Sequence, residues 1–286
     1  MSDNRRMIDR SSLDSEGHST QLGGWALLPV RLWFFSLCIA LNSPSDLKAD
    51  GQEWLSSIGM SDNRPMLDRP LPPGFVGLHP DKRIRKYSRH LPHWRQEGAT
   101  YFVTFRLADS LPEVKQTEIK NLRSHWEYTH PEPRSEQDWE EHARDIIRRT
   151  EAWSDEGHGE CYFREQRWAD TLRDRLHYVH GARYQLNCWV IMPNHCHLIL
   201  RPFEGYELED LIGAMKGITA KLVNAAVGRT GELWEQECFD RIIRDGEHLQ
   251  RVIRYIGNNP QQAGLPRSVW FRWIDPEWQN AGWNFD

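Results

Sequence analysis

The stretch "YQLNCWVIMPNHCHLILRP", residues 184–202, predicts two β-strands joined by a tight turn. Both halves are rich in apolar and β-branched side chains, and Pro193-Asn194 interrupts them. We therefore expect strands over 184–192 and 195–202 that pair as a hairpin.

His195 and His197 stand one residue apart in the second of these strands. Residues i and i+2 of a strand point to the same side, so both imidazoles share one face and Cys196 points to the other. Two neighbouring imidazoles can bind one divalent metal ion. An isolated pair of this kind is more often two ordinary surface histidines. Here the pair follows a turn directly, so we expect both side chains to be reachable by a substrate.

The segments on either side of the hairpin complete an α+β pattern. A β-α-β-β-α-β order is the ferredoxin-like split βαβ arrangement, so we predict an antiparallel sheet of four to five strands with helices on one face and an inserted helical segment. Ser110, with Glu113 at capping-box distance, predicts the start of the first helix, and Pro260 predicts the end of the last. The other predicted strands are 100–108 and 238–245, and the predicted helices are 113–128, 135–153, 164–180, 207–227 and 247–260.

The charge is unevenly distributed along the chain. The net charge of −5 argues at first against a nucleic-acid partner. Residues 131–160 hold ten acids and four arginines, so the rest of the chain sums to about +1. Residues 82–95, "KRIRKYSRHLPHWR", carry six Lys or Arg and no acid. This segment is either a solvated basic arm or an arm that follows DNA phosphates and stacks on bases.

Cysteine usage and hydropathy predict a reduced, cytoplasmic protein. The five cysteines are odd in number, and no two form a C-x-x-C pair. The apolar run "LWFFSLCIAL", 32–41, is too short to span a bilayer and lacks a clean cleavage site after it. We expect no membrane association.

The N-terminal region contains a short repeat, because "MSDNRRMIDR" at 1–10 returns as "MSDNRPMLDR" at 60–69 with eight identical positions. The unit is too short to fold alone, so it reflects a duplication or a true start at Met60. The predicted domains are a disordered or poorly ordered extension over 1–75, a main domain over 76–270 with an acidic helical insertion near 131–160, and a C-terminal tail over 271–286.

The last predicted helix offers a third metal ligand and a nucleophile. Tyr255 and Asn259 are four residues apart and so lie on one helical face. Asn259 could provide an amide oxygen to the ion that the histidines bind. A tyrosine hydroxyl one turn away could then act as a nucleophile beside a Lewis acid. The alternative is a core tyrosine with an asparagine that caps the helix ahead of Pro260.

Three motifs in this order give the chain a family resemblance. They are "MPNHCHLIL", "GELWEQECFDRIIRD" and "RYIGNNPQQAGL", and the upstream "RHLPHWRQEGATYFVTFRLADSLP" and "CYFREQRWADTLRDRLHYVHGARYQLNCWV" add to them. From about residue 87 to 266 the chain resembles the REP-associated tyrosine transposases, relatives of the insertion-sequence transposases in the HUH endonuclease group. The acidic segment 131–160 resembles an extension found in part of that family.

The resemblance implies a role for each matching position. His195 and His197 match the metal ligands, Asn259 the third polar ligand, and Tyr255 the nucleophile. Cys196 stands where the family usually has a bulky apolar residue, a modest departure that removes no ligand.

The resemblance also implies an activity. The expected enzyme binds Mg²⁺ or Mn²⁺ and cleaves and rejoins single-stranded or hairpin DNA through a 5′-phosphotyrosine intermediate. Its relatives are monomers or homodimers, and the sequence does not decide between these states. The alternative is a catalytically silent DNA-binding protein of the same fold.

Several cations and one tryptophan are candidates for DNA contact. Each could equally be a solvated surface residue, because phosphate contacts are chemically generic. The candidates are Arg83, Lys86, Trp94, Lys216, Lys221, Arg241 and Arg244.

Two other metal-site classes fit the sequence less well. A structural zinc site could combine the two histidines with Cys188 and Cys238, but zinc modules usually pair cysteines at short spacing and this chain has no such pair. A barrel hydrolase with a His-x-His pair would need an eightfold βα alternation that the chain lacks.

Overall fold

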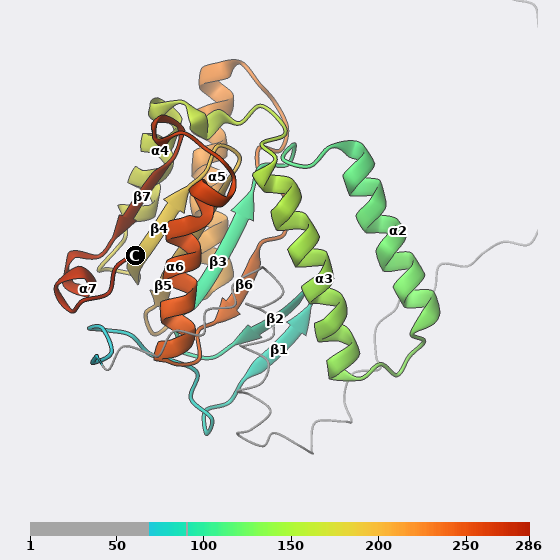
Figure 1. The fold of residues 1–286 in the computed structure, drawn as a ribbon, viewed down its shortest axis with the longest axis horizontal. Coiled ribbons are helices and arrows are strands. Elements are labelled where there is room, and N and C mark those ends of the chain that lie inside the picture. The colour runs from blue at the N-terminus through green and yellow to red at the C-terminus, as the bar shows by residue number, and fades with distance from the viewer. Residues whose placement is uncertain (1–68, 90) are drawn as a thin grey trace, which may run out of the picture. The chain divides into compact units, whose positions relative to one another are not determined.

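A computed structural model describes residues 69–89 and 91–286 (Figure 1). The predictions for the repeat, the start at Met60 and the apolar run 32–41 lie outside the described residues. The core of the described part is a five-stranded antiparallel sheet with the strand order β6-β3-β5-β4-β7. These strands are β3 (Tyr101–Arg106), β4 (Tyr184–Ile191), β5 (His195–Pro202), β6 (Phe239–Ile242) and β7 (Phe271–Ile274).

The predicted hairpin is the centre of this sheet. β4 and β5 pair antiparallel with Ile191 opposite Cys196, and β5 also pairs with β3. β5 thus lies between β3 and β4, which is the split βαβ arrangement, and β6 pairs with the far side of β3. The predicted fold class is confirmed.

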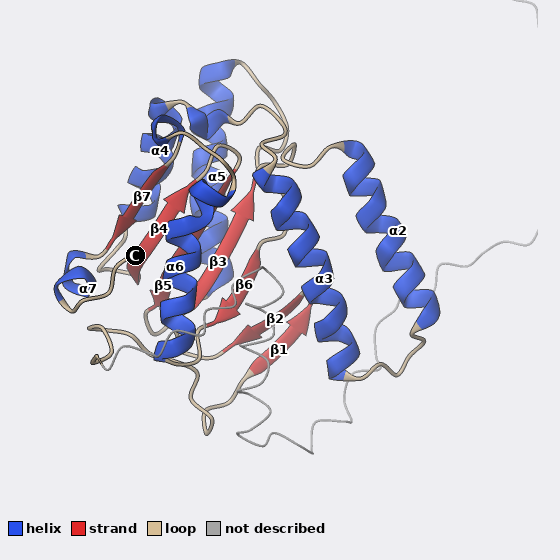
Figure 2. Cartoon of the chain, in the orientation of Figure 1, coloured by secondary structure: helices blue, strands red, loops and turns tan. Residues whose placement is uncertain are grey.

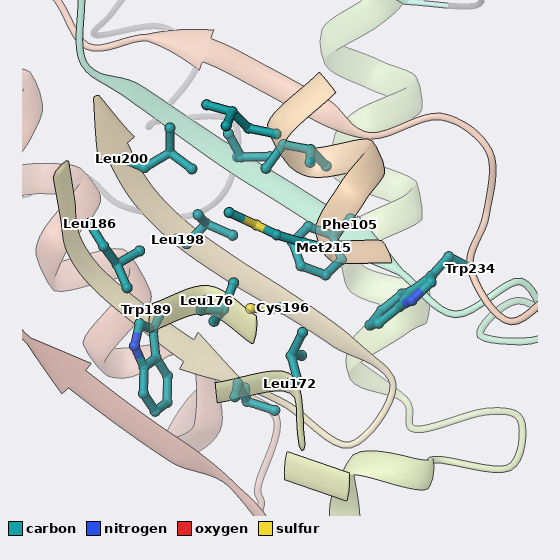
Figure 3. Packing of buried hydrophobic residues seen from close by; sticks show 14 of the residues in the cluster. Phe105, Leu172, Leu176, Leu186, Trp189, Cys196, Leu198, Leu200, Met215 and Trp234 are labelled. Carbon is teal, nitrogen blue, oxygen red and sulfur yellow. The ribbon is translucent and has the colours of Figure 1, made fainter. Parts of the chain in front are cut away.

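Helices cover both faces of the sheet, which differs from the prediction of one covered face (Figure 2). One face packs on α4 (Gln166–His177) and α5 (Leu208–Val227), in an apolar core to which β5 contributes alternate residues such as Cys196 and Leu198 (Figure 3). The other face packs on α6 (Gly246–Gln262). β4 is buried on both faces along nearly its whole length, so its sequence lacks the polar alternation of a one-sided sheet.

The inserted segment forms an arm of two helices, α2 (Glu113–Thr129) and α3 (Glu136–Asp155). The N-cap of α2 is Pro112 rather than the predicted Ser110, whose hydroxyl accepts a hydrogen bond from Arg106 Nη1 at 3.1 Å instead. α3 begins with a capping box between Ser135 and Asp138. Below, "the arm" means α2 and α3.

The two ends of the arm lie next to each other. The Glu160 backbone N–H donates to Asp109 Oδ2 at 3.0 Å. Gly159 has φ +83°, and a Cβ there would lie 2.6 Å from the Asp109 carbonyl oxygen, so this close approach requires glycine. The arm is therefore attached to the sheet through one narrow base.

The basic segment 82–95 forms a second, two-stranded sheet of β1 (Arg85–Ser88) and β2 (Pro92–Arg95). It is not solvated throughout, because two of its polar residues are buried. His93 Nδ1 lies 2.7 Å from Asp240 Oδ2, and Arg95 binds both oxygens of the same carboxylate at 2.5 and 3.0 Å.

The sheet extends beyond the predicted domain boundary at residue 270, since β7 pairs with β4. α7 (Pro276–Asn280) follows, and Trp278 Nε1 donates to the Pro73 carbonyl at 2.9 Å. The end of the proline-rich segment thus packs against the C-terminal residues. Phe285, near the C-terminus, packs closely on α6 at Gly257. A Cβ at that position would lie 2.5 Å from the Cβ of Phe285, so the close approach requires glycine.

α6 runs two residues past Pro260, where the sequence predicts its end. Proline removes only one donor, and the final turn continues with Ala263 N–H bonded to the Asn259 carbonyl at 3.0 Å. Asn259 therefore lies inside the helix and is not its cap. Among the helices of the described residues, none is long and apolar enough to cross a membrane.

Candidate active site

The two histidines of β5 lie on one face of the sheet, with their rings 4.8 Å apart. Each is held through Nδ1. That atom of His195 is 2.8 Å from Asn194 Oδ1, and that of His197 is 2.7 Å from Thr104 Oγ1. The Nε2 atom of His197 has no hydrogen-bond partner. An imidazole fixed through one nitrogen is the usual arrangement of a metal ligand.

Tyr255 and Asn259 reach this face from α6. The Tyr255 ring lies 5.2 Å from the His197 ring, and both pack on Phe102 of β3 at 5.8 to 5.9 Å. The four predicted site residues therefore converge on one face of the sheet. Their roles as ligands and nucleophile stay predictions.

The site is buried, contrary to the expectation that a substrate reaches it directly. His195, His197, Tyr255 and Asn259 are each between 1% and 3% exposed. The reason is α3 of the arm, which lies on the same side of the sheet as α6 (Figure 1).

Two carboxylates of α3 face the site, and sequence reasoning missed both. Asp155 Oδ1 lies 3.5 Å from His195 Nε2. The buried carboxyl group of Glu151 lies next to Tyr255 and interacts with its hydroxyl. The signal in the sequence was their i, i+4 spacing, which places them on one face of a predicted helix.

The imidazoles are neutral. Burial lowers the pKa of His195 to about 4, and burial together with the charge of His195 lowers the pKa of His197 well below its usual value. A neutral imidazole has a free lone pair, which is the form that binds a metal.

The acidic groups of the site are shifted in the opposite direction. Burial raises the pKa of Glu151 to about 8, with a further contribution from Asp155, and raises the pKa of Asp155 to about 7. Burial and the charges of both carboxylates raise the pKa of Tyr255 well above its usual value. The closed site therefore disfavours negative charge on all three groups.

The nitrogen and amide atoms of the predicted metal ligands are in a state that suits the binding of an ion. His197 Nε2 is buried and lacks a hydrogen-bond partner, which is unusual for a buried polar atom. The buried side chain of Asn259 lies beside it and interacts with His195 and Tyr255. In the described part of the chain, no group of three or more His, Cys, Asp or Glu is arranged to hold a metal ion. The predicted set depends on the amide oxygen of Asn259 as its third ligand. Cys188 and Cys238, the partners considered for zinc, pack in different apolar clusters.

The candidates for DNA contact fall into two groups. Lys216 and Lys221 lie on α5, on the opposite side of the sheet from Tyr255. Lys216 Nζ donates to the carbonyls of Glu235 and Gln236 at 2.6 and 2.9 Å, so it holds a loop in place.

The second group lies closer to the site. Trp94, Arg241 and Arg244 line one small pocket between α3 and the strands β2 and β6. Lys86 Nζ lies 3.8 Å above the Trp94 ring. Phe239, in the same pocket, packs on Phe102, which contacts His197 and Tyr255. Arg83 is exposed on the segment before β1.

Comparison with known proteins gives a match to a family model. Residues 162–259, about a third of the chain, are similar to the family described as "Transposase IS200 like". The match includes His195, His197, Tyr255 and Asn259, and the predicted resemblance is confirmed.

A solved structure is also similar to the chain. It is described as the REP-associated tyrosine transposase bound to a REP hairpin, and it is 17% identical with a TM-score of 0.36. The similarity covers 64% of this chain and 76% of that one. No curated protein matches the chain.

Proposed function

We propose that this chain is a metal-dependent endonuclease and transposase that cleaves and rejoins single-stranded DNA at hairpin-forming repeats. The observation that supports this most is the convergence of Tyr255 with the paired imidazoles on one face of the sheet, with ring centroids 5.2 Å apart for Tyr255 and His197. The family match over 162–259 supports it independently. Hairpin DNA as the substrate rests on the resemblance of the sequence motifs.

The proposed reaction is a transesterification. The hydroxyl oxygen of Tyr255 attacks the phosphorus of the scissile phosphodiester, and the bond from phosphorus to the 3′ oxygen breaks. The tyrosine proton leaves to water, and the released 3′ oxygen takes up a proton. One phosphodiester replaces another, so no nucleotide cofactor is consumed. Attack by a 3′-OH on the phosphotyrosine later rejoins the strand.

His195, His197 and Asn259 would hold Mg²⁺ or Mn²⁺. A bound ion supplies Lewis-acid stabilisation of the negative charge that develops on the phosphate. The protein's own contribution is to keep both imidazoles neutral and oriented through Asn194 and Thr104.

Access of DNA requires a change in the arm, because α3 covers the site. DNA would then approach along β2 and β6, where Trp94, Arg241 and Arg244 offer an aromatic ring and cations. Single strands bind through this combination of stacking and phosphate contacts.

The test is a covalent adduct between the protein and a hairpin oligonucleotide that carries a single-stranded extension. With Mn²⁺ present, the wild type should form a band that resists denaturing electrophoresis, and Tyr255→Phe should form none. Tyr178→Phe is the matched control, because Tyr178 is 70% exposed at the end of α4 and should leave the band unchanged. An adduct that persists in Tyr255→Phe contradicts the proposal.

Burial of the site favours a second candidate, a DNA-binding protein without strand transfer. Tyr255 is only 3% exposed, and a permanently closed arm would leave the fold able to bind DNA but not to cleave it. Hairpin binding without any covalent adduct, in the presence of Mg²⁺ or Mn²⁺, would support this second candidate.

A further inference from the structure

The segment of the arm that covers the site is strongly acidic, although the proposed site binds a DNA phosphate. Residues 131–160 carry a net charge of −6, and two of their carboxylates face the site. A site for DNA cleavage has to accept a phosphate, which is also an anion with oxygen atoms at its surface. The carboxyl groups of α3 therefore stand where the oxygen atoms of a substrate phosphate must go.

The two carboxylates are held there at an energetic cost. Burial raises the pKa of Glu151 and of Asp155, and neither carboxylate has a cationic partner among the contacts found at the site. Burial of a carboxyl group without a cation to balance it destabilises the state that contains it, and two nearby acids repel each other. The closed arrangement is thus less stable than its apolar packing alone would make it.

The attachment of the arm permits it to move as one unit. Three of its buried apolar residues, Ile119, Ile146 and Trp153, form a small cluster with Leu111, separate from the two cores of the sheet. Under α3, a pocket of about 70 Å³ remains between Ala143, Ile147 and the strands β2 and β6. Movement of the arm would therefore uncover Tyr255 and this pocket but would leave the core under α4 and α5 packed.

The base of the arm is tied to the turn that carries the histidines. Asn194 Nδ2 donates to the carbonyls of Ser154 and His158, both at 3.0 Å. Just beyond, Gly157 and Gly159 have φ of +74° and +83°. This places a glycine-rich joint next to His195, at the point where α3 ends.

We propose that Glu151 and Asp155 occupy the position of the scissile phosphate in the DNA-free protein, and that the arm is an autoinhibitory cover which DNA displaces. This inference rests on the proposed function for the identity of the site. The inference adds that the acids of α3 compete with DNA for this site.

The test compares two double variants with equal changes in charge. Glu151→Gln with Asp155→Asn neutralises the two facing acids, and Glu141→Gln with Glu156→Gln neutralises two exposed acids of the same segment. The first double variant should bind a hairpin with a single-stranded extension about tenfold more tightly than wild type, in EDTA as well as with Mg²⁺, since like charges that face a phosphate oppose binding. The control should change affinity much less, because exposed charges are screened by salt.

Equal effects in both double variants, or none in either, would overturn the inference. Hydrogen exchange on the wild type provides a second measurement that needs no variant. The amides of residues 136–155 should exchange faster once hairpin DNA is bound, and slower exchange would show that the arm clamps the DNA instead. If neither the wild type nor the first double variant forms a covalent adduct, the proposed function fails, while the binding and exchange results still decide the role of the arm.

Discussion

β5 presents two different surfaces to the two sides of the sheet. On one side Cys196, Leu198 and Leu200 pack into an apolar core under α4 and α5. On the other side His195 and His197 lie under α6 and α3, beside polar atoms that lack partners. A single strand thus contributes to folding on one face and to a chemical site on the other.

The difference between the faces shows where the molecule gains and loses stability. Burial of the apolar side stabilises the fold by roughly 25 cal/mol for each Å² of apolar surface removed from water. Buried imidazole, amide and carboxylate groups without partners have the opposite effect. A face that costs stability is what a functional site looks like, because the partners of its polar groups come from outside the chain.

The largest expected effect is on the rate of adduct formation, which should depend on one face of β5 and not on the other. His197→Ala should lower adduct formation with hairpin DNA on the order of 100-fold or more, since it removes a proposed ligand of the ion. Cys196→Val, one residue away on the apolar face, should leave the rate nearly unchanged. The measurement is the rate of adduct formation with Mn²⁺, and equal losses in both variants would show that the faces do not differ.

The next effect separates the faces by stability. Leu198→Ala should lower the free energy of unfolding by about 3 kcal/mol, because it opens a cavity in a packed core. His197→Leu should cost much less, because the loss of the hydrogen bond to Thr104 is offset by removal of a buried nitrogen, Nε2, that has no partner. Urea unfolding monitored by circular dichroism gives both values, and a large loss for His197→Leu would contradict the description of this face as unsatisfied.

A third comparison contrasts the candidate active site, where His197 Nε2 has no hydrogen-bond partner, with the cluster around His93, whose polar groups bond to one another. Burial would lower the pKa of His93, but hydrogen bonds to Asp240 and Glu237 outweigh it and raise the pKa to about 9. A pKa above the unfolded value of about 6.5 means that His93 stabilises the fold fully below pH 6.5 and that this contribution is lost as the pH rises to 9. The loss is on the order of 3 kcal/mol.

His93→Gln provides the control for this pH dependence. The variant should be less stable than the wild type at pH 6, and the difference between the two should shrink as the pH approaches 9. Unfolding by urea at several pH values measures it. A difference that stays constant with pH would show that His93 acts through packing and not through its charge.

The sequence predicted the parts of the site that depend on local periodicity. The strand alternation placed His195 and His197 on one face, and the helical repeat placed Tyr255 and Asn259 together. The contacts that it missed are long-range. Nothing near Glu151 indicates that it faces Tyr255.

The same limit explains the basic segment 82–95. Its composition left open a solvated arm or an arm that contacts DNA, but Arg95 is buried against Asp240, which lies 145 residues further along the chain. A local pattern reports which side chains share a face, and it does not report what packs on that face. Burial of the site under the arm was unpredictable for this reason.

The smallest expected effect concerns the DNA contacts, again by side of the sheet. Arg241 lines the pocket between α3, β2 and β6 on the side of Tyr255, and Lys221 lies exposed on α5 on the other side. Arg241→Gln should weaken hairpin binding by about threefold to tenfold and reduce the salt dependence of the binding constant by about one ion, since it removes one phosphate contact. Lys221→Gln removes the same charge and should change neither quantity by more than about twofold, because it lies far from the proposed DNA path and acts only through the screened net charge. Binding titrations at several salt concentrations measure both, and a larger fall of the salt slope in Lys221→Gln than in Arg241→Gln would place the DNA on the face of α5 instead.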